Sequence, residues 1–111
     1  MSTIAPGQTL RFVAKNDLKL TPQPAIFYLS LSAKDTLEKE AKVKELTDES
    51  SGAEVINKIK QEFAGVVTGW ENFGSPFDWD QIDSLLTLNG LWELVYGVLS
   101  GNHVSDDEKK N

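Results

Sequence analysis

Four carboxylates set among aromatic residues are the side chains of this sequence best suited to acid–base chemistry: Glu71, Asp78, Asp80 and Asp83. Two carboxylates beside a sugar-stacking aromatic platform are what glycoside hydrolysis requires. However, Asp78 opens a segment with the pattern of a helix N-terminus, so capping explains Asp78 and Asp80, while Asp83 is expected to face water. A chain of 111 residues also provides little surrounding structure that could bury a carboxylic acid and raise its pKa. The sequence therefore favours capping and solvation over catalysis.

Other catalytic and ligand-binding patterns are missing from the sequence. The single histidine, His103, lies with Ser105 in a charged C-terminal tail, where it cannot be held with the precision that catalysis demands. The absence of cysteine excludes thiol catalysis and Cys-ligated zinc. The acidic run Asp106-Asp107-Glu108 lacks the pattern of a calcium loop, and no glycine-rich phosphate motif is present. We predict no enzyme activity, no catalytic residue, no metal site and no cofactor.

The charge balance also limits the partners that this chain can take. It carries 17 Asp and Glu against 11 Lys and Arg, a formal net charge of −6. Binding to nucleic acid or to an anionic membrane surface depends on clustered Lys and Arg, so neither partner is expected. No apolar run approaches the roughly 20 residues of a membrane span, and the N-terminus lacks the pattern of a signal peptide. These features predict a cytoplasmic protein.

The N-terminal third reads as β-structure. Residues 1–8 are small and polar, which predicts a flexible arm. Residues 9–15 alternate between apolar and polar types, as in a half-buried strand. Pro22 and Pro24 exclude a helix. Residues 25–32 then predict a second strand with one face formed by Phe27, Leu29 and Leu31, so that residues 9–32 make a hairpin or part of a small sheet.

Helical patterns follow. Ser32 resembles the start of a capping box and opens a surface helix over residues 33–46, with acid-before-base pairs at Asp35–Lys39, Glu38–Lys42 and Glu40–Lys44. Ser51 and Glu54 form a second capping-box pattern ahead of a helix over 53–69, with one apolar face. Gly65 lies inside that pattern, and Gly69 suits its C-terminal cap.

Two shorter helices complete the prediction. Asp78 begins a short helix that Asn89-Gly90 breaks, and residues 91–100 resume with Trp92 and Tyr96 as an i,i+4 pair. The charged tail, 102–111, is expected to be disordered. The chain is thus a single α+β domain over 9–101, a small N-terminal hairpin or sheet packed on three or four helices. Its predicted core is Phe12, Phe27, Leu29, Ile56, Ile59, Phe63, Val67, Leu86, Leu94 and Val98.

The segment TGWENFGSPFDWD, residues 68–80, is the densest aromatic stretch of the chain. Such a segment is either a small hydrophobic core between two helices or an exposed platform for a partner. The same two interpretations apply to the later Trp–Tyr pair. Because exposed aromatic side chains are typical hot spots of protein interfaces, the candidate partner-binding residues are Trp70, Phe73, Phe77, Trp79, Trp92 and Tyr96.

The order of these features resembles a known family. The strand pair RFVAKNDLKLTPQPAIFYLSLS with its Pro-x-Pro turn precedes a charged helix, and VVTGWENF leads through a Gly/Pro turn to PFDWDQIDSLL and LWELVYGVL. This arrangement, over residues 9–100, is similar to the tail assembly chaperones of long-tailed, siphovirus-type bacteriophages and prophages. Members often combine a strand segment and Pro-x-Pro turn with a V-x-x-W step, a "pF" turn and a closing helix pair.

The resemblance implies a non-enzymatic cytoplasmic protein that is absent from the finished virion. It would bind the tape-measure protein and keep its apolar surfaces from aggregating until tail-tube subunits replace it, and self-association is possible. Family members are often also made in a longer, frameshifted form, which would extend from the polar C-terminus SDDEKKN. The family fixes none of the six aromatic candidates as a site residue, so their assignment is our own hypothesis.

Two alternatives remain open at this point. The first is another phage or prophage tail protein, structural or needed for tail completion, which would stay in purified particles. The second is an acidic inhibitor or adaptor of a host factor that mimics nucleic acid. Such a mimic needs carboxylates in a regular array, and the lysines that alternate with acids along residues 34–45 interrupt any such array.

Overall fold

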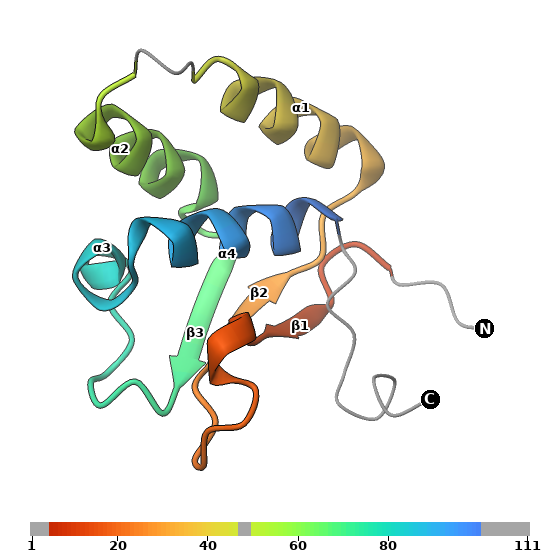
Figure 1. Cartoon of the computed structure of the whole chain (residues 1–111). Helices are drawn as coiled ribbons and strands as arrows, with labels where there is room; N and C mark the ends of the chain where they lie inside the picture. Colours follow the sequence, from red (N-terminus) through yellow and green to blue (C-terminus); the bar gives the residue numbers. More distant parts are fainter. Residues whose placement is uncertain (1–4, 47–49, 101–111) are drawn as a thin grey trace.

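The computed structural model describes residues 5–46 and 50–100 (Figure 1). Residues 1–4 of the predicted arm, and the whole predicted tail with His103, Ser105 and the acidic run, lie outside the described residues. The fold is α+β, as predicted. Its elements, in chain order, are β1 (Thr9–Phe12), η1 (Lys15–Asp17), β2 (Ala25–Leu29), α1 (Ala33–Lys44), α2 (Gly52–Phe63), β3 (Val67–Glu71), η2 (Trp79–Gln81), α3 (Ile82–Leu85) and α4 (Leu88–Ser100).

The three strands form one antiparallel sheet in the order β1-β2-β3. The predicted β1–β2 hairpin is therefore confirmed, with β2 as the central strand. Its register pairs Leu10 with Tyr28 across β1 and Ile26 with Trp70 across β3. Helix α4 covers the inner face of the sheet, and the α1–α2 pair lies on the far side of α4 (Figure 1). The buried side chains that the sheet contributes to the core are Phe12, Ile26, Tyr28, Val67 and Trp70.

Strand β3 replaces the end of the predicted helix over 53–69, which was wrong beyond Phe63. The register shifts between Phe27 and Tyr28, because Phe27 pairs with Gly69 and Tyr28 with Val67. The extra residue is a bulge, which brings Val67 and Trp70 to the same face although they are three residues apart. That spacing is also the spacing of a helix face, so the apolar pattern runs from α2 into β3 without an apparent break.

Neither Gly65 nor Gly69 has the role that the sequence predicted for it. Gly65 lies just after α2 with a φ of +80°, in the left-handed region that favours glycine, so it makes the turn from helix to strand. Gly69 lies within β3, where an added Cβ would meet Phe27 Cδ2 at an ordinary 3.8 Å. It is therefore a strand residue and not a helix cap.

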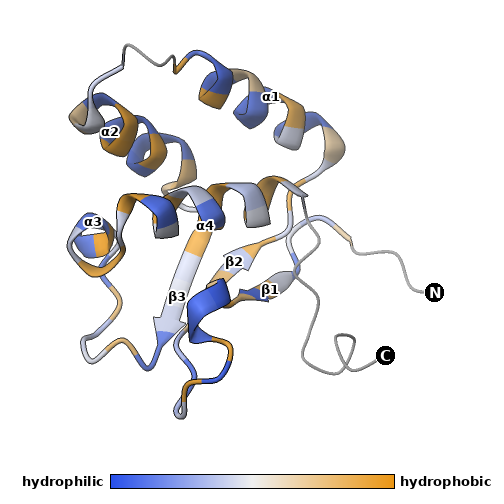
Figure 2. Cartoon of the chain, viewed as in Figure 1, coloured by the Kyte–Doolittle hydropathy of each residue, from blue (hydrophilic) through white to orange (hydrophobic). Residues whose placement is uncertain are grey.

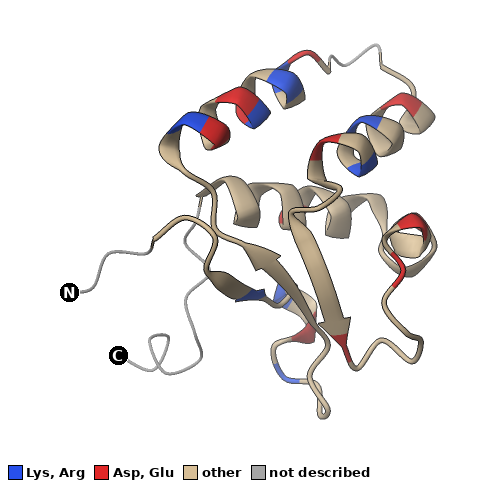
Figure 3. Cartoon of the chain, turned by 180° about the vertical axis from the view of Figure 1, so that it is seen from behind, with Lys and Arg blue, Asp and Glu red and all other residues tan. Residues whose placement is uncertain are grey.

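The prediction that Phe27 and Leu29 belong to the core was also wrong. Both side chains are only half-buried on the outer face of the sheet, whereas Ile26 and Tyr28 are fully buried on the inner face. No helix crosses this outer face in the view from behind (Figure 3). Both faces of β2 are apolar, so alternation along the strand alone could not select the buried one.

Residues 5–8 of the predicted flexible arm are attached to the sheet. The Ser30 hydroxyl donates to the Ala5 carbonyl and accepts from the Gln8 amide at 3.0 Å, and the Gly7 amide donates to the Ser30 carbonyl at 2.9 Å. Ser30 is itself only 9% exposed. A buried hydroxyl that both donates and accepts satisfies the backbone of this segment, so the described part of the arm has a fixed path.

The helix N-termini follow the capping patterns of the sequence. The Ser32 hydroxyl accepts from the Asp35 amide at 3.1 Å at the start of α1. Ser51 and Glu54 form a complete capping box at the start of α2. Of the three predicted ion pairs along α1, the structure shows Glu40–Lys44 at 3.2 Å, while Lys39 instead donates to the Glu62 carbonyl of α2.

The break between the last two helices lies earlier than predicted. Leu86 has extended backbone angles and ends α3, and the Thr87 hydroxyl accepts from the Gly90 amide at 3.0 Å. Thr87 is thus the N-cap of α4, and Asn89-Gly90 forms part of its first turn instead of a break. The free energy gained from the N-cap hydrogen bond offsets the low helix propensity of one glycine in the first turn.

The core lies between the inner face of the sheet, α2 and α4. Of the ten predicted core residues, six are buried, and Ile56 and Leu86 are half-buried against that core. The sequence prediction missed Tyr28 and Ile26, which are at most 1% exposed. The confirmed residues are Phe12, Ile59, Phe63, Val67, Leu94 and Val98.

The turn at Gly65 and the strand position of Gly69 are testable by two matched substitutions. We expect Gly65→Ala to destabilise the fold by about 1–2 kcal/mol, because alanine is strained at this positive φ although nothing lies within 4 Å of its Cβ. We expect Gly69→Ala to change the free energy of unfolding by less than about 0.5 kcal/mol. Urea denaturation of both variants measures the difference, and the reverse order of stabilities would contradict the strand at Val67–Glu71.

Candidate functional site

The candidate aromatics Trp70, Phe73 and Phe77 form one cluster at the end of β3. The Trp70 and Phe73 ring centroids are 5.4 Å apart, and Trp70 and Phe77 meet edge to face at 4.7 Å. The Trp70 indole donates to the Ser75 carbonyl at 3.0 Å, which holds the loop over the ring. Trp70 is 9% exposed and Phe77 39% exposed. This cluster fits the description of a small hydrophobic core with one exposed edge.

Trp79 packs against α2, away from a free surface. Its indole donates to the Lys60 carbonyl of α2 at 2.9 Å, and the ring is half-buried against the core. The Asp78 carboxylate caps the turn by accepting from the Asp80 amide at 3.2 Å, as the sequence predicted. Lys60 also pairs with Asp83 at 3.4 Å. These contacts fasten the η2–α3 corner to α2, which is a structural role for Trp79.

The acidic residues of this region do not form a paired site. Glu71 pairs with Arg11 at 3.2 Å, so three of the four carboxylates already have a partner within the chain. A catalytic acid needs a pKa raised by burial or by a neighbouring carboxylate. Among residues 5–46 and 50–100, no group of three His, Asp or Glu side chains is placed to hold a metal ion.

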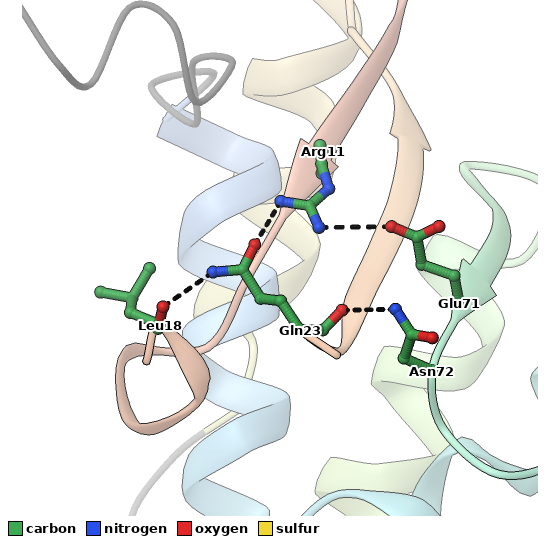
Figure 4. A network of polar contacts seen from close by, with 5 residues as sticks. All are labelled: Arg11, Leu18, Gln23, Glu71 and Asn72. Carbon is green, nitrogen blue, oxygen red and sulfur yellow. Dashed lines mark hydrogen bonds and ion pairs between the residues drawn. The ribbon is translucent and has the colours of Figure 1, made fainter. Parts of the chain in front are cut away.

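Arg11 and Glu71 belong to a polar network on the outer face of the sheet (Figure 4). Arg11 reaches across β2, donating to Gln23 at 2.6 Å and to Glu71 at 3.2 Å. The Gln23 amide donates to the Leu18 carbonyl at 2.9 Å, and Asn72 donates to the Gln23 carbonyl at 2.8 Å. The network fixes the loop between β1 and β2 to the end of β3, so its role is to shape the sheet.

Trp92 and Tyr96 lie on one flank of α4, where Trp92 is half-buried against the core and Tyr96 is exposed. Their rings stack at 5.7 Å with an interplanar angle of 25°, as the i,i+4 spacing predicts. Tyr96 is 63% exposed, the second most exposed of the large hydrophobic side chains that the structure describes. The pair lines a hollow of about 590 Å³ between α4 and α1, together with Glu40, Val43, Lys44, Leu46, Leu99 and Ser100.

A second hollow, of about 370 Å³, continues the first. It shares Leu99 and Ser100 with the first hollow and is otherwise lined by Leu10, Ser30, Leu31, Ala33, Thr36, Leu37 and Val98. We call the two hollows together the α1–α4 groove. Among the described residues that line it, the charged ones are Glu40 and Lys44, whose side chains pair at 3.2 Å. Colouring by hydropathy shows hydrophobic and hydrophilic stretches along both α1 and α4, the two helices that border the groove (Figure 2).

The groove follows α1 from Ala33 to Lys44. At a rise of about 1.5 Å per residue, this stretch is roughly 16 Å long, or about three helical turns. Leu37, which lines its rim, is 65% exposed. A long, open groove with exposed aliphatic and aromatic side chains can bind apolar side chains of a partner.

The structure thus separates the six candidates into three places. Trp70, Phe73 and Phe77 form one cluster, Trp79 lies against α2, and the Trp92–Tyr96 pair lines the α1–α4 groove. Sequence reasoning missed Leu37, Val43 and Leu99 as lining residues. The available signal was Leu37, a large apolar residue on a helix whose neighbours are charged.

Glu45, at the C-terminus of α1, has a lowered pKa. A hydrogen bond and the charge of Lys58, at 3.1 Å, together with the charge of Lys42, hold the pKa of Glu45 below its ordinary value of 4.5. A carboxylate with a lowered pKa in the folded state stabilises that state above the unfolded-state pKa. This contribution is lost as the pH falls through the lowered value.

Replacing a candidate aromatic from each of two places distinguishes structural from surface roles. We expect Trp79→Ala to lower the free energy of unfolding by about 2–3 kcal/mol, because the ring leaves a cavity and the Lys60 carbonyl loses its donor. We expect Tyr96→Ala to change it by less than about 0.5 kcal/mol. Thermal denaturation measures both, and an unchanged Tm for Trp79→Ala would restore Trp79 as a surface candidate.

The Glu45–Lys58 pair gives a pH-dependent prediction. Glu45→Gln should be less stable than the parent at pH 7, because it removes a carboxylate that the folded state favours. The difference should shrink as the pH falls below 4.5 and vanish once Glu45 is protonated in both states. Denaturation curves of the two proteins across this range provide the measurement. A difference that persists at low pH would mean that Glu45 acts through packing and not through charge.

Comparison of the chain with protein-family models, with curated proteins and with solved structures finds no match. In the part of the chain that the structure describes, no helix is both long enough and apolar enough to cross a membrane. The α1–α4 groove, with its exposed Trp92–Tyr96 stack, is therefore the candidate functional site on geometry alone.

Proposed function

We propose that this protein is a non-enzymatic, cytoplasmic tail assembly chaperone that holds an apolar helical segment of a phage tape-measure protein in the α1–α4 groove. The observation that carries the proposal is the open groove lined by Trp92 and Tyr96, whose two described charged lining residues, Glu40 and Lys44, pair with each other. The sequence resemblance supplies the identity of the partner. The groove supplies the surface with which such a partner could be bound.

The lining of the groove favours a helix over an extended peptide. Trp92, Tyr96 and Leu99 stand at i, i+4 and i+7 on α4, so they form one ridge along the helix. Such a ridge packs between the ridges of another helix that lies along it. An extended peptide would instead gain its affinity from backbone hydrogen bonds to a sheet edge, whereas the hollow that Trp92 and Tyr96 line is bordered by α1 and α4.

The charges of the chain suit a chaperone that must stay soluble while it holds an apolar partner. Acidic and basic residues are interspersed along α1 (Figure 3). The net charge of −6 makes complexes repel one another, which opposes their aggregation. Inside the groove, the absence of an unpaired charge avoids the desolvation cost that a buried ion would impose on the complex.

A pull-down with tagged protein from cells that produce the source phage or an induced prophage tests the proposal. We expect a long, helix-rich tape-measure protein to co-elute, and this protein to be missing from purified virions. Trp92→Ala/Tyr96→Ala should weaken the recovered complex at least about tenfold, because central aromatic residues dominate such interfaces.

The matched control is Leu18→Ala/Leu20→Ala, which removes two exposed leucines that do not line the groove. This variant should bind like the parent. Recovery of the protein in purified particles would instead indicate a structural tail component. Co-elution of a host nuclease, polymerase or repressor would favour the inhibitor, and equal loss of binding in both variants would reject the groove as the site.

A further inference from the structure

The α1–α4 groove consists of two hollows with a boundary between them. We call the hollow of about 590 Å³ the aromatic hollow, because Trp92 and Tyr96 line it, and the hollow of about 370 Å³ the aliphatic hollow. Leu99 and Ser100 line both hollows, so they stand at the boundary. A helix that docks on the open groove by one face therefore meets two separate recesses.

The interval between the hollows follows from α1. Within this helix, the residues that line the aliphatic hollow span positions 33–37, and those that line the aromatic hollow span positions 40–44. The midpoints of these spans, 35 and 42, are seven residues apart, or about 10.5 Å at a rise of about 1.5 Å per residue. On α4 the interval is shorter, because Leu99 and Ser100 border both hollows. Helix α1 therefore sets the upper limit.

Two spacings up to that limit place side chains on the same face of a docked helix, namely four and seven residues. Side chains four residues apart are separated by only about 6 Å along the axis. With one of them in either hollow, the other would lie against Leu99, at the boundary. Side chains seven residues apart clear the boundary and enter both hollows.

The two hollows also differ in size and lining. The larger one is bordered by the stacked rings of Trp92 and Tyr96, against which another aromatic ring gains a stacked or edge-to-face contact. The smaller one is lined by aliphatic side chains that include Leu10, Leu31 and Leu37. The aromatic hollow thus suits an aromatic side chain, and the aliphatic hollow suits one such as leucine.

Charge distinguishes the hollows a second time. Of the described residues around the aliphatic hollow, none is charged, whereas Glu40 and Lys44 line the aromatic hollow. Lys44 directs one of the three donors of an ammonium group to Glu40 at 3.2 Å, and its side chain is 74% exposed. A carboxylate on the partner can therefore also accept from Lys44. Because Lys44 ends α1 on the side away from the aliphatic hollow, this acidic residue lies beyond the aromatic one.

We propose that the groove recognises an amphipathic helix by three residues on one face: an aliphatic residue, an aromatic residue seven positions away, and an acidic residue about one turn beyond the aromatic one. This inference rests on the proposed function and defines the helical segment that the groove holds. The helix docks by its face, so α1 and α4 keep their positions.

Synthetic helical peptides test the recognition pattern. Isolated helices shorter than about 12–15 residues are marginal in water, so the probe is an alanine-based peptide of roughly 20 residues with a fluorescein label. It carries leucine, phenylalanine seven positions later and glutamate four positions after that. Comparison peptides move phenylalanine to a spacing of four or five, or replace the glutamate with lysine. Fluorescence polarisation measures binding to the full chain.

We expect the spacing of seven to bind at least about tenfold more tightly than four or five, because the displaced ring leaves its hollow. The glutamate peptide should bind about threefold more tightly than the lysine peptide at low salt, and Lys44→Glu should invert this preference. The matched control is Lys34→Glu, an equal change of charge at an exposed position of α1 that lines neither hollow. It should leave the preference as in the parent.

The outcomes separate this inference from the proposed function. Equal binding at all spacings, or a charge preference that Lys44→Glu does not invert, rejects the recognition pattern while the groove stands as a binding site. The pattern is likewise rejected if no peptide binds although the tape-measure protein co-elutes and Trp92→Ala/Tyr96→Ala abolishes its recovery. If that double variant recovers the tape-measure protein as well as the parent does, the groove is not the site, and both proposals fail.

Discussion

The contact between the central strand β2 and helix α4 organises the rest of the molecule. Ile26 and Tyr28 point from β2 into the core, where they join Leu94 and Val98 of α4, and all four are at most 2% exposed. The Tyr28 hydroxyl donates a long hydrogen bond, 3.5 Å, to the Gly97 carbonyl in this buried layer. Strands β1 and β3 then pair with the edges of β2, and α2 packs beside α4.

The groove follows from the composition of α4. This helix is apolar around much of its circumference, so it needs more than one partner to bury its surface. The sheet covers one side and α2 contributes to the same core. The remaining flank, with Trp92 and Tyr96, faces α1, whose side chains are too polar and too weakly inserted to cover it. The exposed aromatic stack is therefore what remains of an apolar helix in a small domain.

Interactions between residues that are close in the sequence could be predicted, whereas packing between distant segments could not. The caps at Ser32, Ser51 and Asp78 involve residues two or three positions apart, and the structure confirms them. The buried face of β2 could not be predicted, because it depends on where α4 lies. The bulge in β3 was hidden since it reproduces helical spacing. At the site, the Trp92–Tyr96 stack is local and was predicted, whereas its pairing with α1 is a long-range contact.

The weak packing of α1 is the reason that the flank of α4 stays open. If α1 carried large apolar residues towards α4, it would close the flank, and the apparent affinity for any partner would fall with the population of the open form. If α1 were missing, Trp92, Tyr96 and Leu99 would form an uncovered patch of the kind that promotes aggregation. A charged helix that buries none of its residues avoids both outcomes, because it lies beside the α4 flank without filling it.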